Sequence, residues 1–242
     1  MTKNPIPLLR IPADAHAIFK SRPNRYLAVV DIDEPQIMLN EKTHVHDPGR
    51  LTELLFPGNE LLLQHKPGEH RKTQWDVTAA KFEGNWILIH SGFHRMIVEE
   101  LFQNPAVCPF PNLKNIQAEV TYGHSRLDFQ LTDKENKKIW VETKGCTLAR
   151  DKIALFPDAP TKRGAKHIQS LIELTRNGDQ TAIIILVFRK DAGHFAPNRE
   201  TDPEFTDLFY QAIDEGVEVF PLLLEYENSF ISYLGRIPIY ST

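Results

Sequence analysis

The sequence has little of several features that would indicate particular classes of protein. Only two cysteines, Cys108 and Cys146, occur in 242 residues, too few and too unpatterned for a disulfide framework or a zinc site. No apolar run approaches the ~20 residues of a membrane span, and the first ten residues hold no apolar stretch of signal length. The glycines are too scattered for a nucleotide-binding fingerprint, and no internal repeat is visible. We therefore expect a cytoplasmic protein with no membrane contact.

An excess of positive charge is also absent. The formal net charge is -4, and the composition, 41% hydrophobic and 25% charged, is ordinary for a soluble globular protein of one or two domains. Such a chain has no overall basic field that would attract nucleic acid. Any contact of that kind must come from local patches.

Two runs separated by a polar loop carry the strongest indication of chemistry. Residues 126–131 and 139–144 alternate between apolar and polar side chains, as strands with one buried face do, and the seven residues between them are polar. The pattern predicts a hairpin. We expect one face of its first strand to carry the apolar residues Leu127, Phe129 and Leu131. Asp128, Glu142 and Lys144 are then predicted to converge on the other face.

Two carboxylates and one ammonium are a minimal set for holding a divalent cation beside a phosphodiester. Mg²⁺ and Mn²⁺ prefer oxygen ligands, and Lys144 would stabilise the charge that develops in the transition state. The alternative is a solvated sheet face, with cross-strand ion pairs worth roughly 0.2 to 1 kcal/mol each. Spacing alone leaves both interpretations open.

The pattern of secondary-structure signals in the sequence changes near residue 85. Before it, short strand-like runs at 26–31, 36–40, 60–64 and 74–80 alternate with Pro and Gly turn signals, and residues 51–56 read as a short helix. This pattern predicts a small β-barrel in residues 1–85.

Residues 86–242 show helical and buried-strand patterns instead. Residues 94–103, 161–177 and 203–215 read as helices, with Thr161 as an N-cap and Gly178 and Gly216 as stops. The apolar runs at 181–188 and 217–224 are typical of strands buried on both faces. We predict an α/β domain with a mixed sheet flanked by helices.

Motifs along the whole chain resemble the sugar fermentation stimulation protein A (SfsA) family. In the second half these are Glu119-Val-Thr-Tyr-Gly-His-Ser-Arg-Leu-Asp-Phe129, Val141-Glu-Thr-Lys144, Phe156-Pro-Asp-Ala159 and Thr161-Lys-Arg-Gly-Ala-Lys-His167. In the first half they are Arg22-Pro-Asn-Arg25, His44-Val-His-Asp-Pro-Gly-Arg-Leu51, Leu54-Leu-Phe-Pro-Gly58 and Arg71-Lys-Thr73. The resemblance implies an N-terminal OB-like barrel and a C-terminal domain similar to the PD-(D/E)XK nuclease superfamily. It also implies DNA binding and a link to regulation of sugar, particularly maltose, catabolism.

The same resemblance suggests roles for four residues. Asp128 corresponds to the superfamily's metal-binding Asp, and Glu142 and Lys144 form its Glu-x-Lys element. Glu99 fits the acidic helix residue that supports the water shell of the metal. The middle residue of the element is usually aliphatic and here is Thr143, whose carbonyl could serve as a ligand.

Positive charge is concentrated after this motif. Between residues 144 and 167 six basic residues outnumber two acidic ones, and Lys162, Arg163 and Lys166 stand at the start of a predicted helix. Cations there are unfavourable with the helix dipole, which suggests an anionic partner such as DNA. The alternative is a solvated helix face.

The predicted barrel offers a second set of basic residues, Arg22, Arg25, Arg71 and Lys72, which would contact DNA. OB-type barrels bind single strands with basic grooves and aromatic platforms, for which Tyr26 and Trp75 are candidates, although Trp75 is favoured as a core or rim residue.

Four histidines lie near these regions. His44 and His46 are two apart with Asp47 beside them, which could form a metal site, although a structural role is the favoured interpretation. His124 and His167 flank the acidic motif and could act in acid–base chemistry.

Two hypotheses follow. The first is a Mg²⁺- or Mn²⁺-dependent nuclease, and the second is a DNA-binding regulator that cleaves nothing. A sugar-binding protein has little support, because aromatic and amide residues form no recognisable platform. Strand preference, physiological substrate and oligomeric state are left open.

Overall fold

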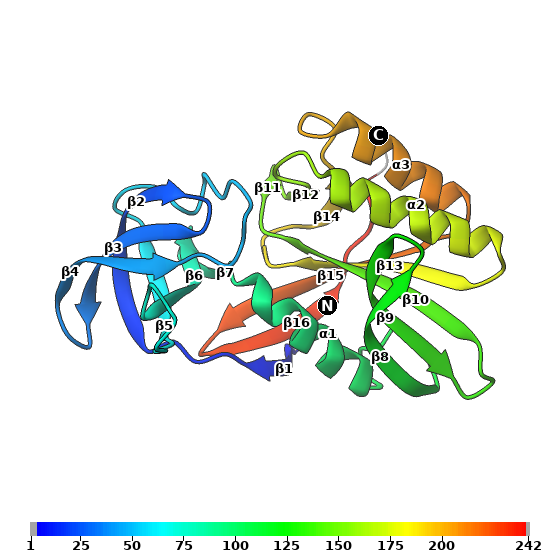
Figure 1. Ribbon diagram of the computed structural model, residues 1–242, viewed down its shortest axis with the longest axis horizontal. Coiled ribbons are helices and arrows are strands. Elements are labelled where there is room, and N and C mark those ends of the chain that lie inside the picture. Colours follow the sequence, from blue (N-terminus) through cyan, green and yellow to red (C-terminus); the bar gives the residue numbers. More distant parts are fainter. Residues whose placement is uncertain (1–3, 241–242) are drawn as a thin grey trace.

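The computed structural model describes residues 4–240, and these form a β-barrel beside a larger unit with helices on its sheet (Figure 1). The barrel strands are β2 (Ala15–Asn24), β3 (Leu27–Glu34), β4 (Met38–His44), β5 (Glu60–His65) and β6 (Trp75–Phe82). They pair in the order β4-β3-β2-β5-β6, and a parallel pairing of β4 with β6 closes the ring. Five strands closed in this order form an OB-type barrel, which confirms the predicted fold of the first half.

Buried and more exposed residues alternate along barrel strands such as β2 and β3, and the buried ones form the barrel interior. In β3 the buried residues Ala28, Val30 and Ile32 alternate with more exposed neighbours. A strand with one face toward a core is expected to show this period of two.

The second unit is built on a mixed sheet. Its strands are β1 (Ile6–Arg10), β8 (Leu113–Tyr122), β9 (Ser125–Asp133), β10 (Lys138–Cys146), β13 (Gln180–Val187), β15 (Glu218–Glu227) and β16 (Phe230–Arg236). The strand β7 (Asn85–Leu88) pairs with β6 of the barrel and at one position with β15, so it connects the two units. The strands β10, β13 and β15 run parallel, while β8, β9 and β16 pair antiparallel with their neighbours. A small second sheet contains β11 (Ala149–Arg150), β12 (Ile153–Phe156) and β14 (His194–Pro197).

Helices cover the sheet from two sides (Figure 1). A 3-10 turn, η1 (Ser91–Phe93), leads into α1 (His94–Gln103), whose apolar residues join the core cluster that also contains the barrel interior. The helices α2 (Lys162–Arg176) and α3 (Pro203–Asp214) pack against the other cluster. The predicted mixed sheet flanked by helices is therefore confirmed.

Local signals determine where the long helices begin and end. The Thr161 side chain accepts a hydrogen bond from the Gly164 N–H at 3.0 Å, and Gly178 at φ +93° follows the last turn of α2. The Asp202 side chain caps α3 in the same way, and Gly216 at φ +102° follows it. These are the ends that the sequence pattern predicts, and the Asp202 cap is an additional finding of the structure.

Two features differ from the sequence pattern. Residues 51–56 form turns rather than the predicted helix, because Leu51 takes φ +49° and the segment closes only one turn of hydrogen bonds, to the Leu51 carbonyl. The strand β1 pairs with β16 in the large mixed sheet of the second unit, although it comes first in the chain. The division near residue 85 stays a prediction.

Across residues 4–240, none of the helices combines the length and apolar character that crossing a bilayer requires.

Candidate active site

The candidate site lies where strands β9 and β10 separate. Their ladder runs from Thr132 opposite Lys138 to Phe129 opposite Val141. At the next position Asp128 Oδ2 accepts a hydrogen bond from the Thr143 backbone N–H at 2.7 Å. The Asp128 carboxylate therefore takes the place of a backbone acceptor, which fixes its position against β10.

The predicted alternation of β9 holds for burial but not for the face each residue occupies. Leu127 packs in the cluster covered by α2 and α3, whereas Phe129 and Leu131 pack in the cluster that includes α1. The prediction of one shared apolar face is therefore wrong. The face changes because the regular ladder between β9 and β10 ends at Phe129, before Asp128.

Glu142 is held in the interior by two cationic or polar neighbours. Its side chain is 2% exposed, its Oε1 accepts a hydrogen bond from Lys144 Nζ at 2.5 Å, and His167 Nδ1 contacts the same oxygen. Burial alone would raise the pKa of Glu142, but Lys144 and His167 outweigh burial and lower it. Among the described residues, Glu142 Oε2 has no hydrogen-bond partner. The buried Glu142 carboxylate thus has one oxygen, Oε2, that is free to bind a ligand.

The pKa of Asp128 is shifted upward, in the opposite direction to that of Glu142. Burial and then the negative charge of Glu142 raise its pKa to about 6, against smaller opposing effects from Lys144 and the Thr143 N–H. Two carboxylates that repel each other in a poorly solvated place fit a divalent cation, because a hard cation relieves the repulsion and takes oxygen ligands. The donor set therefore suits Mg²⁺, Mn²⁺ or Ca²⁺.

A cavity of about 210 Å³ opens beside Asp128. Its lining residues come from the start of α1 and from β8, β9 and β10: Ser91, His94, Arg95, Glu119, Asp128, Phe129 and Thr143. Burial lowers the pKa of His94 to about 4, so this imidazole is neutral at physiological pH. The adjacent strands β8 and β9 each contribute one acidic residue to the cavity lining, Glu119 and Asp128.

Glu119 is the acid that the sequence reasoning missed. It lies between Ala118, paired with Phe129, and Val120, paired with Leu127, which puts it opposite Asp128. Its φ of +54° is a left-handed conformation that strains a residue with a side chain. The hairpin turn between β8 and β9 was the available signal, because counting back from it aligns this residue with Asp128.

The predicted helix acid, Glu99, lies on α1 and accepts a hydrogen bond from Arg95 Nε at 2.8 Å. Arg95 also lies 3.7 Å from Glu119, which pairs in turn with Arg126 at 3.1 Å. The Glu99 charge is therefore compensated within its own helix.

The basic residues of α2 lie on the same helix as His167, which contacts Glu142 of β10. Lys162, Arg163 and Lys166 are exposed, whereas His167 on the same helix is buried. The Arg163 Nε donates to His167 Nε2 at 3.4 Å, so a chain of contacts links the exposed cation to Glu142. His124, the other flanking histidine, is exposed in the turn between β8 and β9.

The four basic residues predicted in the barrel divide into two pairs. Arg22 donates to four backbone carbonyls, including those of residues 47 and 49, and burial lowers its pKa. Arg71 donates to Asp76. Arg25 and Lys72 are exposed. The first pair therefore holds the chain's own loops, and the second pair faces solvent.

The aromatic candidates also differ from each other. Tyr26 is 50% exposed and lines a cavity of about 400 Å³ together with Lys72. Trp75 packs against the core, with its ring 4.7 Å from that of His65. Tyr26 is thus the exposed member of the two.

Comparison with known proteins agrees with this architecture. Residues 92–230 match the family described as "Sugar fermentation stimulation protein RE domain", and residues 21–89 match "SfsA N-terminal OB domain". The chain is 44% identical to a sugar fermentation stimulation protein homolog of Methanococcoides burtonii, over 99% of this chain and 97% of that protein. It is 40% identical to a homolog of Thermosipho melanesiensis, over 96% and 97%. The solved structure of Pyrococcus furiosus SfsA in complex with Ca²⁺ is similar, with a TM-score of 0.89 and 28% identity, over 98% of this chain and 100% of that chain.

Proposed function

The chain belongs to the sugar fermentation stimulation protein (SfsA) family, and on this premise we propose that it is a Mg²⁺- or Mn²⁺-dependent nuclease acting on DNA. One observation carries the proposal: the buried Glu142 has an oxygen with no hydrogen-bond partner in residues 4–240, and its charge helps to raise the pKa of Asp128. The Ca²⁺ in the Pyrococcus furiosus relative supports a hard-cation site in this family.

We assign metal binding to Asp128 and Glu142, with the Thr143 carbonyl as a further oxygen ligand. A bound Mg²⁺ or Mn²⁺ supplies an acidified water nucleophile and stabilises charge on the phosphoryl oxygens. Lys144 orients Glu142 through their 2.5 Å hydrogen bond and adds positive charge for the transition state. His167 holds the same Glu142 oxygen from α2 and is a positioning residue.

A supporting acid completes the proposed centre. The family resemblance gives that role to Glu99, but Glu99 is not among the residues that line the cavity beside Asp128. Glu119, which lines the cavity with Asp128, suits the role better. We therefore assign support of the metal's water shell to Glu119, and an indirect role through Arg95 to Glu99.

DNA contact is assigned to exposed cations on both units. Lys162, Arg163 and Lys166 would bind the backbone near the centre, and Arg25 and Lys72 would extend the contact over the barrel. Arg22 and Arg71 act indirectly, since their guanidinium groups hold loops of the barrel.

A second candidate is a DNA-binding regulator of sugar catabolism that cleaves nothing. Its support is that Lys144 and His167 both contact the buried Glu142 carboxylate and compensate its charge. Binding to DNA with no cleavage in either Mg²⁺ or Mn²⁺ would favour it.

The test uses labelled single- and double-stranded DNA with Mg²⁺ or Mn²⁺. The wild type and an exposed-surface control, Asp214→Asn, are expected to cleave, and Asp128→Asn is expected not to. Products that accumulate equally with Asp128→Asn contradict the assignment.

A further inference from the structure

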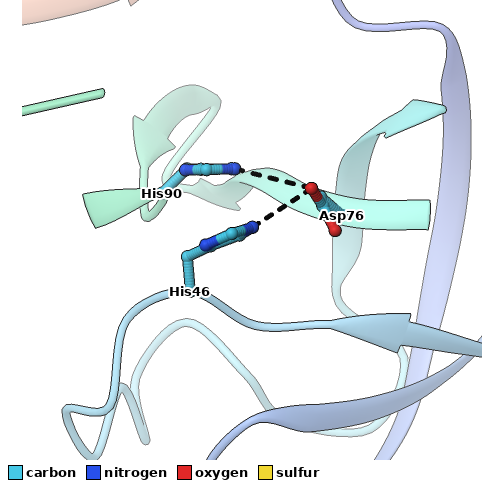
Figure 2. A group of neighbouring side chains, drawn as sticks. All are labelled: His46, Asp76 and His90. Carbon is cyan, nitrogen blue, oxygen red and sulfur yellow. Dashed lines mark ion pairs between the residues drawn. The ribbon is translucent and has the colours of Figure 1, made fainter. Parts of the chain in front are cut away.

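Three side chains from separate segments converge at the junction of the barrel and the second unit. His46 follows β4, Asp76 belongs to β6, and His90 lies between β7 and η1. One donor atom from each lies within 4.8 Å of the others. Figure 2 shows both imidazole rings directed toward the same Asp76 oxygen.

The spacing of these atoms suits coordination to an ion. Asp76 Oδ2 lies 3.1 Å from His46 Nε2 and 3.9 Å from His90 Nε2. Ligands about 2.0–2.1 Å from a tetrahedral zinc ion lie roughly 3.4 Å from each other. The two distances therefore bracket the spacing that such an ion imposes.

His46 and Asp76 form an ion pair, but well-aligned hydrogen bonds do not account for the whole arrangement. The buried His46 Nε2 makes no hydrogen bond within the described residues, although it is close to Asp76. The separation between His90 and Asp76 exceeds hydrogen-bond length, and the two imidazole rings stack with centroids 3.7 Å apart. Buried polar atoms are normally satisfied, so an absent partner is indicated.

The surroundings of the three residues hold them in place. Arg71 donates to Asp76 Oδ1, which leaves Oδ2 directed toward the histidines. The Ser91 hydroxyl donates to the His46 carbonyl at 2.8 Å, and the Phe93 N–H donates to the His90 carbonyl at 3.1 Å. Supporting contacts of this kind orient metal ligands in proteins.

The ligand chemistry distinguishes this cluster from the acidic centre. Imidazole nitrogens suit Zn²⁺ and similar transition metals, whereas Mg²⁺ and Ca²⁺ prefer oxygen ligands. His46 also lines the 400 Å³ cavity that contains Tyr26 and Lys72, so a fourth position would face that opening. Three protein ligands and one open position are the arrangement of catalytic zinc sites, whereas structural zinc sites usually have four protein ligands.

We propose that His46, Asp76 and His90 bind one Zn²⁺ ion, which fastens the segment after β4 to the junction between the barrel and the second unit. This site is separate from the Asp128 and Glu142 centre and does not depend on nuclease activity.

The test titrates Zn²⁺ into chelator-treated full-length protein by calorimetry. We expect one Zn²⁺ per chain, and a loss of affinity on the order of 100-fold or more in His46→Ala and in His90→Ala. His44→Ala is the matched control, because its ring lies 4.3 Å from that of His46 but outside the group, and it should bind as the wild type does. Asp128→Asn should also bind Zn²⁺ normally. Unchanged binding in the His46→Ala/His90→Ala double variant overturns the proposal.

A second measurement needs no variant and so is independent of folding defects. Co²⁺ added to the metal-free wild type should give the strong visible absorption of a four-coordinate site, and one equivalent of Zn²⁺ should remove it. A weak six-coordinate spectrum, or one that Zn²⁺ leaves unchanged, refutes the site.

Discussion

Replacing Asp128 with Asn should stabilise the metal-free protein while removing its metal site. The pKa of Asp128 rises from an ordinary 3.8 to about 6, through burial and the charge of Glu142. A difference of about 2 pH units corresponds to about 3 kcal/mol. Since Asp128 is partly exposed, solvent screening reduces this to about 1–2 kcal/mol. The amide oxygen that Asp128→Asn introduces can still accept the hydrogen bond from the Thr143 N–H.

The sign of the effect depends on pH. Because the folded pKa lies above the unfolded one, the folded state binds the proton more tightly, and stability falls as pH rises from about 4 to about 6. Above that range the ionised Asp128 destabilises the wild type by the full amount. The advantage of Asp128→Asn should therefore be about 1–2 kcal/mol at pH 8 and should shrink toward zero below pH 4.

Urea unfolding in the presence of a chelator measures this difference directly. The control, Asp214→Asn, changes an exposed carboxylate at the end of α3 and should show no comparable pH dependence. Adding Mg²⁺ should stabilise the wild type and leave Asp128→Asn unchanged. A variant less stable than the wild type at pH 8, or an advantage that does not vary with pH, would refute the electrostatic reasoning.

Three further predictions concern the proposed centre and its DNA contact. Lys144→Gln should lower the cleavage rate by roughly 10²–10³-fold with DNA affinity nearly unchanged, as single-turnover rates would reveal. Changing both Lys162 and Lys166 to Gln should reduce the slope of log affinity against log salt by roughly 2, measured by fluorescence anisotropy, and an unchanged slope excludes them as phosphate contacts. Glu119→Gln should weaken Mg²⁺ binding in calorimetry more than Glu99→Gln does, and the reverse order would return the supporting role to Glu99.

Local patterns in the sequence predicted much of the fold. The helix α2 begins after the Thr161 cap and ends before Gly178, and both signals act within a few residues of the ends they determine. The buried run of β13 is equally local. By contrast, the pairing of β1 with β16 joins the two ends of the chain, and no nearby residue encodes it.

The same distinction explains what could be predicted of the sites. Asp128 and Glu142 lie on one hairpin, so their proximity follows from a short register. The contact of His167 with Glu142 depends on how α2 packs on the sheet, which periodicity does not specify. The spacing of His46 suggested a partner in Asp47, but Asp47 accepts a hydrogen bond from its own turn at Gly49. Tertiary packing alone brings His46 to Asp76 and His90.

The most direct test of the central claim is the single-turnover cleavage of labelled DNA in Mn²⁺ by the wild type and by Asp128→Asn, prepared in parallel. Because we expect the variant to be at least as stable as the metal-free wild type, lost activity could not be attributed to unfolding. We predict Mn²⁺-dependent cleavage by the wild type that Asp128→Asn lacks. Cleavage at the same rate by both proteins would contradict a catalytic metal centre at Asp128 and Glu142.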